Sequence, residues 1–511
     1  MALAPRPSLR VLMISAELES LARTGGLGDV VEALSLALAE LGLDVLVVTP
    51  LYGVTRLPSL TTRWPERVTA RWGWGPSDVR RLGIVETEPV RFASGGVRRV
   101  ALLDDPELFG RDGIYGDRRG PFDDNALRFA VMSRGGLEVA ERVWPGGPDV
   151  IHAHDWHATF AVLYARLVMG PRWARIPSVL TVHNLQFQGV LDESWLDRLH
   201  LPRAAYRPEV LWHEGRVNLM KGATAHADRI TTVSPTYARE ILGAEEGCGL
   251  ALHLRAHADK LVGILNGIDL ARWDPRTDGA IAARFDEHTA KAQRPVDKLA
   301  LEKELGLDPR AGPLFGLVAR LSWQKGLDLL LPLLPELVNR GARFAVVGEG
   351  DRGFEEQLAY LAAAHPGRIA ARIAFDPALA RRVYAGSDFF LVPSRFEPCG
   401  LTQMYAMRYG AIPVVTDVGG LHDTVDPIVG ARASETGTGI VAARVATDAV
   451  HAACLAAMRL HADGRPLERA VVRAMKRAGA FGWTDPAAKY RRSYEGLVAR
   501  RRAPAASGRS A

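Results

Sequence analysis

Hydrophobic residues in the first fifty positions form two nearly continuous runs with a helical stripe between them. The runs LRVLMIS at 9–15 and LDVLVVTP at 43–50 have the apolar character of strands that are buried on both faces. Gly42 ends the segment between them, whose apolar positions recur at helical spacing: Val30, Leu34, Ala37 and Leu41. The pattern therefore predicts a β-α-β unit at the start of the chain.

The same order returns at 313–350, in PLFGLVARLSWQKGLDLLLPLLPELVNRGARFAVVGEG. A strand-like run leads through a loop to a long apolar helical stretch and then to a second strand that ends in glycines. Two such starts in one chain predict an α/β fold with two Rossmann-like domains.

Four segments are expected along the chain. We expect an N-terminal domain at 1–264 and a C-terminal domain at 265–479, followed by an amphipathic helix at 480–502 and a disordered tail at 503–511. Residues 51–148 are less regular and predict strands and loops inserted in the first domain. Within them, Asp123-Asp124-Asn125 has the composition of a helix N-terminal cap.

A further strand–turn–helix pattern is centred on 393–410. The buried run 388–392 must end at Pro393, because proline cannot continue a central strand. A helix is expected from Gly400, which places Glu397 beside a helix N-terminus. Free N–H groups there suit an anion, and a carboxylate binds hydroxyls, so a sugar phosphate fits the mixture. From the spacing alone, an ordinary turn with a structural glutamate fits as well.

Composition narrows the class of protein. The length of 511 residues suggests two to four domains, and we interpret the chain as two large ones. With 48% hydrophobic and 24% charged residues, the composition is typical of a globular enzyme. Three cysteines cannot form a disulfide framework and favour a reducing compartment. The first apolar run is short and preceded by Arg6, so it predicts a strand and not a signal peptide, and no run reaches membrane-spanning length.

The net charge of +6 raises the question of whether the protein binds nucleic acid. Arginine pairs such as Arg80-Arg81 and Arg381-Arg382 are scattered and lack interleaved aromatic residues, so a solvated surface is favoured. Part of the positive charge would also favour an anionic nucleotide sugar.

Histidines gather near two strand ends in the N-terminal half. His152, His154 and His157, with Asp155, have the residue types of a metal site, but they span a strand end and a helix start, where side chains diverge. We therefore expect no metal there. His183 ends the next strand, at the edge where open α/β sheets bind ligands.

The segment SRFEPCGLTQMYAMRYG at 394–410 is accompanied by six further motifs in order: RTGGLGDV at 23–30, HAHDWH at 152–157, TVHNLQFQG at 181–189, SPTYAREI at 234–241, NGID at 266–269 and ARLSWQKGLDL at 319–329. Together they span nearly the whole chain. They resemble the signature sequences of the bacterial glycogen synthase and plant starch synthase family, glucosyltransferases that use ADP-glucose.

This resemblance implies the GT-B architecture, in which two Rossmann-like domains face each other across a deep cleft. The N-terminal domain would hold the acceptor and part of the donor phosphate loop, the C-terminal domain would bind ADP-glucose, and the last helix would cross back to the N-terminal domain. The implied reaction transfers glucose to the non-reducing end of an α-1,4-glucan with retention of configuration and releases ADP. It belongs to glycogen biosynthesis in the cytoplasm and needs no metal or other cofactor.

The resemblance also implies cations for the donor diphosphate. Arg320 and Lys325 match the pair that holds the two phosphates. The loop with Gly25 and Gly26 would approach the same group, and Arg23 stands there where the family usually has lysine. Arginine keeps the charge but changes the reach and geometry.

Other matches concern the sugar and the base. Asp155 would bind acceptor or donor sugar, and the His183 backbone carbonyl would stabilise the oxocarbenium ion. Asn266 would bind the donor glucose, and Tyr115 would lie beside its pocket, although a packing role also fits that tyrosine. Phe375 matches a position where the family often has tyrosine stacked on adenine.

The turn before the predicted helix completes the expected site. Glu397 would bind sugar hydroxyls, with a role as covalent nucleophile as the rival, and the helix start would contact the donor through Cys399, Gly400, Leu401 and Thr402. Alternatives are a UDP-glucose-dependent GT-B transferase and an inert glucan-binding protein on the same fold. The oligomeric state is left open.

Overall fold

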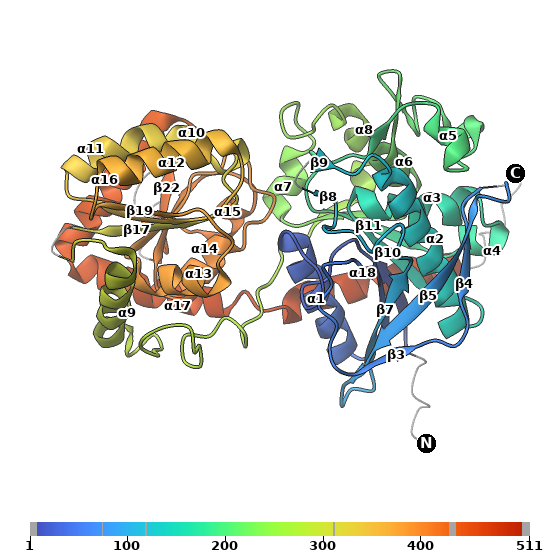
Figure 1. Ribbon diagram of the computed structural model, residues 1–511, viewed down its shortest axis with the longest axis horizontal. Helices are drawn as coiled ribbons and strands as arrows, with labels where there is room; N and C mark the ends of the chain where they lie inside the picture. The colour runs from blue at the N-terminus through green and yellow to red at the C-terminus, as the bar shows by residue number, and fades with distance from the viewer. Residues whose placement is uncertain (1–7, 74, 118–119, 310–311, 429–435, 503–511) are drawn as a thin grey trace, which may run out of the picture. The chain divides into compact units, whose positions relative to one another are not determined.

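The computed structural model describes residues 8–73, 75–117, 120–309, 312–428 and 436–502. The chain divides into two compact units (Figure 1). The first unit comprises residues 1–233, 238–264 and 483–511, and the second comprises 234–237 and 265–482. The tail at 503–511, for which disorder was expected, lies outside the described residues.

The first unit is built on a large sheet whose strand order is β16-β15-β11-β10-β1-β2-β7-β5-β3. The strands from β16 to β7 pair in parallel, which confirms the predicted β-α-β start. The helices and strands of this central part are β1 (Arg10–Ile14), α1 (Gly26–Glu40), β2 (Asp44–Pro50), β7 (Val97–Asp104), β10 (Val150–His154), α3 (Thr159–Leu167), β11 (Ser178–Val182), β15 (Arg229–Thr232) and β16 (Leu261–Gly263).

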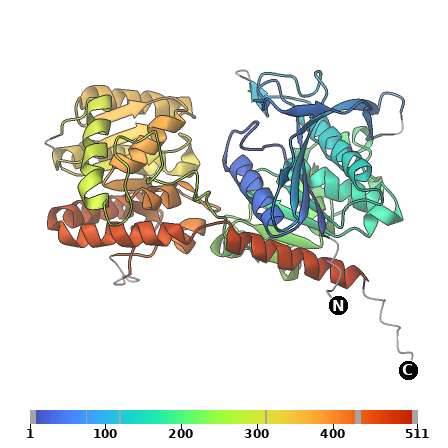
Figure 2. The ribbon, with the colours of Figure 1, turned by 90° about the horizontal axis from the view of Figure 1, so that it is seen from below.

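Alternate residues of β1 and β2 pack against different helices, as the two-residue period of a strand requires. Val11, Met13 and Val45 join a buried core with α1 and the C-terminal helix α18 (Thr484–Arg502). Figure 2 shows α18 lying along this side of the first unit. Ile14 faces α2 (Asn125–Val143), where a side chain at Gly136 would come within 2.8 Å of its Cδ1 atom. Glycine therefore lets α2 lie close on the sheet.

Residues 51–148 add strands to the main sheet as well as loops. β5 pairs antiparallel with β7, and β4 and β3 pair with β5. The Asp124 side chain does not cap α2, contrary to expectation, because its carboxylate receives two hydrogen bonds from Arg111, at 2.6 and 2.7 Å. The added strands are β3 (Thr61–Arg63), β4 (Val68–Arg71), β5 (Val79–Thr87), β6 (Val90–Arg91), β8 (Gly116–Asp117) and β9 (Gly120–Pro121).

Short elements complete the first unit, including a small antiparallel sheet in the order β12-β14-β13. They are α4 (Pro171–Ala174), β12 (Val190–Leu191), α5 (Trp195–Arg198), β13 (Trp212–His213), β14 (Arg216–Asn218), α6 (Leu219–His226) and α8 (Ala251–Ala256). The helix α7 (Pro235–Glu240) begins in residues of the second unit and ends in residues of the first. In the part of the chain that the structure describes, no helix is long and apolar enough to cross a membrane.

The second unit has a parallel sheet in the order β19-β18-β17-β20-β21-β22. Phe315 on β17 stacks on Phe344 of β18 and Phe389 of β20, with ring centroids 5.4 and 5.3 Å apart, so aromatic rings pack across three neighbouring strands of this sheet. Its elements are α9 (Ala290–Leu305), β17 (Leu314–Val318), α10 (Leu327–Leu330), α11 (Leu334–Asn339), β18 (Arg343–Val347), α12 (Arg352–Ala364), β19 (Ile369–Arg372), α13 (Pro377–Gly386), β20 (Phe389–Val392), α14 (Thr402–Arg408), β21 (Ile412–Thr416), α15 (Gly419–Thr424), β22 (Ile440–Ala442), α16 (Thr447–Asp463) and α17 (Arg465–Gly479).

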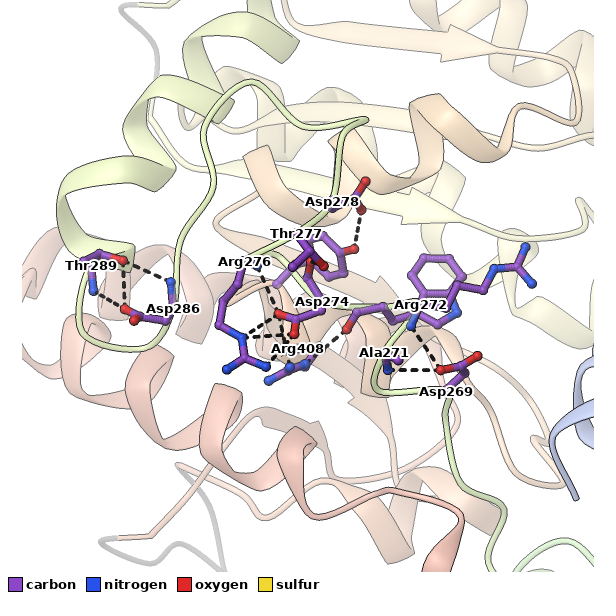
Figure 3. Close-up of polar contacts among 12 residues, drawn as sticks. Asp269, Ala271, Arg272, Asp274, Arg276, Thr277, Asp278, Asp286, Thr289 and Arg408 are labelled. Atoms are coloured by element: carbon purple, nitrogen blue, oxygen red, sulfur yellow. Dashed lines mark hydrogen bonds and ion pairs between the residues drawn. The ribbon is translucent and has the colours of Figure 1, made fainter. Parts of the chain in front are cut away.

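The loop between residues 266 and 289 is held by carboxylates that accept backbone N–H groups (Figure 3). Asp274 accepts the N–H of Arg276 and forms an ion pair with its side chain, and Arg408 of α14 approaches the same carboxylate at 3.3 Å. Asp278 accepts from Arg381 at 2.7 Å and from the Tyr409 hydroxyl. These contacts fix a loop without regular structure that begins at Asn266.

Candidate active site

In the first unit, three candidate site residues follow adjacent parallel strands. Asp155 and His183 were predicted from the sequence, and Glu17 was not. Glu17 comes shortly after β1, Asp155 directly after β10 and His183 directly after β11. These strands are neighbours in the sheet, so their carboxyl ends meet at one edge. This edge is where open α/β sheets bind ligands.

Glu17 holds the glycine loop before α1. Its Oε2 atom accepts the backbone N–H of Thr24 at 2.7 Å and of Gly25 at 3.1 Å, and its Oε1 atom accepts the Thr24 hydroxyl at 3.1 Å. The Gly25 N–H, which we expected to face a diphosphate, is therefore engaged by an internal carboxylate. Sequence reasoning missed Glu17, although a carboxylate just after the first strand is the signal that could have found it.

Tyr115 connects the inserted region to the same carboxylate. Its hydroxyl donates to Glu17 Oε1 at 2.6 Å, and its ring stacks on His157 with centroids 4.7 Å apart. Burial, followed by the charge of Glu17, raises the pKa of this phenol well above its ordinary value. Tyr115 is therefore a neutral hydrogen-bond donor in the cluster.

Arg23 is partly buried and lies between two carboxylates. Its guanidinium pairs with Asp29 of α1 and approaches Glu19 at 3.5 Å. These contacts hold the cation at the start of the glycine loop, next to Gly25. Gly26 is the first residue of α1, so the helix begins earlier than the apolar pattern suggested.

Asp155 organises the backbone at His183. It adopts a φ of +57°, which is uncommon for a residue with a side chain. Its Oδ1 atom accepts the N–H of His183 at 2.7 Å and approaches that of Asn184 at 3.4 Å. Burial raises the pKa of Asp155 to about 7, although these two N–H groups act in the opposite direction.

The nearby histidines are neutral at physiological pH. Burial lowers the pKa of His152, His157 and His183 to about 3, and it lowers the pKa of His154 well below its usual range. Among the described residues, no group of three or more potential ligands from His, Cys, Asp and Glu could hold a metal ion.

In the second unit, Lys325 and Glu397 form an ion pair at the carboxyl edge of the sheet. Lys325 follows β17 and Glu397 follows β20, which are adjacent strands. The Lys325 Nζ atom donates to Glu397 Oε2 at 2.6 Å, and the Ser394 hydroxyl donates to the same oxygen at 2.8 Å. The side chain of Glu397 is nearly buried, while that of Lys325 is about a quarter exposed.

The helix after this turn is short. α14 contains seven residues, with Leu401 as its N-cap and Thr402 as its first residue, so the field at its N-terminus is weaker than that of a long helix. Gly400 has a φ of +70°, and a Cβ atom there would lie 2.5 Å from Oε1 of Gln403. The turn thus requires glycine at position 400.

Asn266 and Cys399 lie together beside this turn. Burial raises the pKa of the Cys399 thiol to about 12, while hydrogen bonds with Asn266 act to lower it. The Asn266 side chain is buried, and its Oδ1 atom has no hydrogen-bond partner among the residues that the structure describes. An unsatisfied buried acceptor is suited to a ligand hydroxyl.

The remaining two predicted residues are more exposed. Arg320 lies in the loop between the end of β17 and Lys325, and it is exposed. Phe375 precedes α13 and is 70% exposed, as expected of a ring that a ligand would cover.

Two α/β units, each built on a parallel sheet, have the architecture of the GT-B class of glycosyltransferases. Comparison with known proteins identifies the family within this class. Residues 10–256 match the starch synthase catalytic domain, and residues 312–459 match the group 1 glycosyl transferases. Glycogen synthase from Leptothrix cholodnii is 41% identical over 96% of this chain and 100% of its own, and glycogen synthase from Anaeromyxobacter dehalogenans has the same identity and coverage.

A solved structure agrees. The catalytic domain of starch synthase IV from Arabidopsis thaliana, bound to ADP and acarbose, is 30% identical, with a TM-score of 0.87 over 96% of this chain and 100% of that one. The chain belongs to the glycogen synthase and starch synthase family. The fold and family expected from the sequence are confirmed.

Proposed function

We propose that the protein transfers glucose from ADP-glucose to the non-reducing end of an α-1,4-glucan with retention of configuration, and that it releases ADP. The observation that carries this proposal is the Lys325–Glu397 pair at the sheet edge of a chain that matches glycogen synthases over 96% of its length. A cation and a carboxylate in contact can bind a phosphate and a sugar hydroxyl, which the donor presents side by side.

The second unit binds the donor in this proposal. Lys325 has three N–H donors, so it can keep its bond to Glu397 and also meet a phosphate oxygen. Arg320 supplies the second cation, and each such donor contributes about 3 kcal/mol as negative charge develops on the leaving diphosphate. Asn266 and Glu397 bind hydroxyls of the glucose, and Phe375 stacks on the base.

The first unit binds the acceptor and supports the reacting carbon. Asp155 accepts the N–H groups of the two peptides on either side of His183, so it restricts the peptide that carries the His183 carbonyl. That carbonyl stabilises the positive charge on the glucosyl group. Arg23 and the Gly26 end of the glycine loop meet the diphosphate in this proposal, and Gly25 keeps its N–H group on Glu17.

Retention follows from transfer on one face of the sugar. The bond between the anomeric carbon and the diphosphate oxygen breaks, the acceptor hydroxyl oxygen attacks the same face, and its proton passes to the leaving phosphate. Glu397 binds hydroxyls in this scheme, because Lys325 and Ser394 already engage its Oε2 atom. These interactions lower its nucleophilicity.

Charge neutralisation in this scheme comes from lysine and arginine, so we propose no metal cofactor. We also propose the cytoplasm as the compartment, since all three cysteines, Cys248, Cys399 and Cys454, are free thiols.

The test is ADP release from ADP-glucose with and without glycogen, together with the length of the glucan product. We expect release that depends on glycogen, chains extended by α-1,4-linked glucose, and loss of both in Lys325→Ala. Faster release from UDP-glucose would reassign the donor. Glucan binding without nucleotide release from either donor would identify an inert binding protein and overturn the proposal.

A further inference from the structure

A chain of hydrogen bonds and ring contacts in the first unit leads from the C-terminal helix to His183. Tyr494 of α18 has its hydroxyl 2.7 Å from Nδ1 of His152. The His152 ring lies against that of His154, with centroids 4.1 Å apart, because the two alternate on β10 and share a face. Nδ1 of His154 lies 3.1 Å from Nε2 of His183. His152, His154 and Tyr494 are fully buried.

The hydrogen bonds of His152 determine its tautomer. If the Tyr494 hydroxyl donates to Nδ1, the Nε2–H group of His152 donates to Thr181 Oγ1 at 2.6 Å, and the Thr181 hydroxyl can donate to Thr231 Oγ1 at 2.6 Å. In this direction every step has one donor and one acceptor. The reverse direction leaves the phenolic proton of Tyr494 without an acceptor in the chain.

The same reasoning gives the tautomer of His154. Its Nε2 atom is buried and has no hydrogen-bond partner within the described part of the chain. A buried acceptor without a partner is tolerated better than a buried N–H without one. The proton of His154 therefore lies on Nδ1 and is donated to Nε2 of His183, which leaves the His183 proton on Nδ1.

We infer that His154 is a positioning residue, which holds the His183 imidazole in one orientation and in the Nδ1–H tautomer, and that Tyr494 holds His154 in turn through His152. His183 then presents a fixed N–H donor to an oxygen of the sugar, and its backbone is fixed separately by Asp155. The C-terminal helix thus contributes to the site without containing a residue that touches substrate. The kinetic part of this inference rests on the proposed function.

Variants of His154 separate positioning from folding. In His154→Leu the donor to His183 is lost while the volume is nearly kept, and we expect kcat to fall by about 10- to 100-fold with little change in KM for ADP-glucose. In His154→Asn the side-chain amide returns a donor near the Nδ1 position, so kcat should recover by about tenfold over His154→Leu. Equal kcat in both variants, when both are folded, would overturn the inference.

The helix contribution has a matched control. Tyr494→Phe removes the hydroxyl that meets His152, and we expect kcat to fall by about three- to tenfold. Tyr164→Phe removes an equally buried hydroxyl, which donates to the Leu199 carbonyl at 2.8 Å elsewhere in the first unit, and should lower Tm similarly without changing kcat. Equal kcat in Tyr494→Phe and wild type would remove the helix from the inference.

The tautomer can be measured without turnover. In the full-length protein labelled with nitrogen-15 histidine, long-range correlations distinguish protonation at Nδ1 from protonation at Nε2. We expect His183 as the Nδ1–H form in wild type and as a mixture in His154→Leu. A wild-type His183 protonated at Nε2 would overturn the inference. An enzyme that releases no ADP would contradict the proposed function instead, and the spectrum would still decide the tautomer.

Discussion

Replacing Glu17 is the most direct test of how the first unit holds its glycine loop. The carboxylate is buried and accepts two backbone N–H groups, of Thr24 and Gly25, and two hydroxyls, of Thr24 and Tyr115. Glu17→Ala would leave these four donors without their acceptor. A buried donor left unsatisfied costs about 1–3 kcal/mol, and the two hydroxyls can rotate toward water or other acceptors.

The two backbone N–H groups therefore dominate, and we expect Glu17→Ala to destabilise the first unit by about 3 kcal/mol. For a unit of nearly 300 residues, that corresponds to a decrease in Tm of about 5 °C. The loop that carries Arg23 and Gly25 would lose its anchor, so kcat/KM for ADP-glucose should fall by about 10- to 100-fold.

Glu17→Gln should behave differently. Its amide oxygen can take the place of Oε2 and accept both backbone N–H groups, while its NH2 group donates to the Thr24 and Tyr115 hydroxyls, which accept as readily as they donate. Only the charge is lost, so Tm should fall by about 2 °C or less and kcat/KM by about fivefold or less.

Thermal unfolding and initial rates of ADP release would check both variants. Asp105→Ala is the control, since Asp105 is a buried carboxylate of the same unit whose hydrogen bonds are with the N–H groups of Glu107 and Leu108, away from residues 23–25 in the sequence. It should lower Tm without lowering kcat/KM. The reasoning is refuted if Glu17→Ala has a kcat/KM equal to or above that of wild type, which would mean that the carboxylate competes with the donor for the Gly25 N–H.

Three further outcomes are expected. Arg23→Ala should lower kcat/KM for ADP-glucose by roughly 10- to 1,000-fold, and Arg23→Lys should recover much of this loss. If kcat/KM of Arg23→Ala stays within about twofold of wild type while Lys325→Ala is inactive, the Arg23 cation is dispensable. Burial raises the pKa of Asp155 to about 7, so ionisation of this carboxyl destabilises the folded state as pH rises from the pKa of the unfolded chain through 7. The Tm of Asp155→Asn minus that of wild type should therefore be larger at pH 8 than at pH 5. An equal difference at both pH values would contradict this. Activity should stay within about twofold in EDTA, and a loss that magnesium or zinc restores would show that Arg320 and Lys325 are not sufficient.

The two Rossmann-like domains could be predicted because their strands are parallel and buried on both faces, which leaves continuous apolar runs in the sequence. The ends of the helices next to the site were harder to predict. Glycine and proline marked the turn at Gly400, but nothing in the spacing showed that α14 would be only seven residues long. Likewise, an aspartate before α2 fits a cap, yet a salt bridge with Arg111 engages the Asp124 side chain. Local propensity does not report a competing partner that is distant in sequence.

The contact between His154 and His183 shows the same limit. The sequence places both near strand ends, but their proximity depends on the register of β10 against β11, in which His154 lies opposite Thr181. A shift of one residue would turn His154 to the other face of the sheet. Register comes from packing along the whole strand, so a pairing of this kind follows from the fold and not from the motif.

The protonation states of the first unit explain why so many histidines can lie near a site that we assign to a negatively charged donor and a neutral acceptor. A cationic imidazole would attract the diphosphate to the wrong position, whereas burial keeps His152, His157 and His183 neutral, with pKa values of about 3. Positive charge is then left to Arg23 in the first unit and to Arg320 and Lys325 in the second. Histidine can donate a hydrogen bond to a sugar oxygen without competing for the phosphates. That separation of roles requires burial of the imidazoles, and for His152 the C-terminal helix provides part of it through Tyr494.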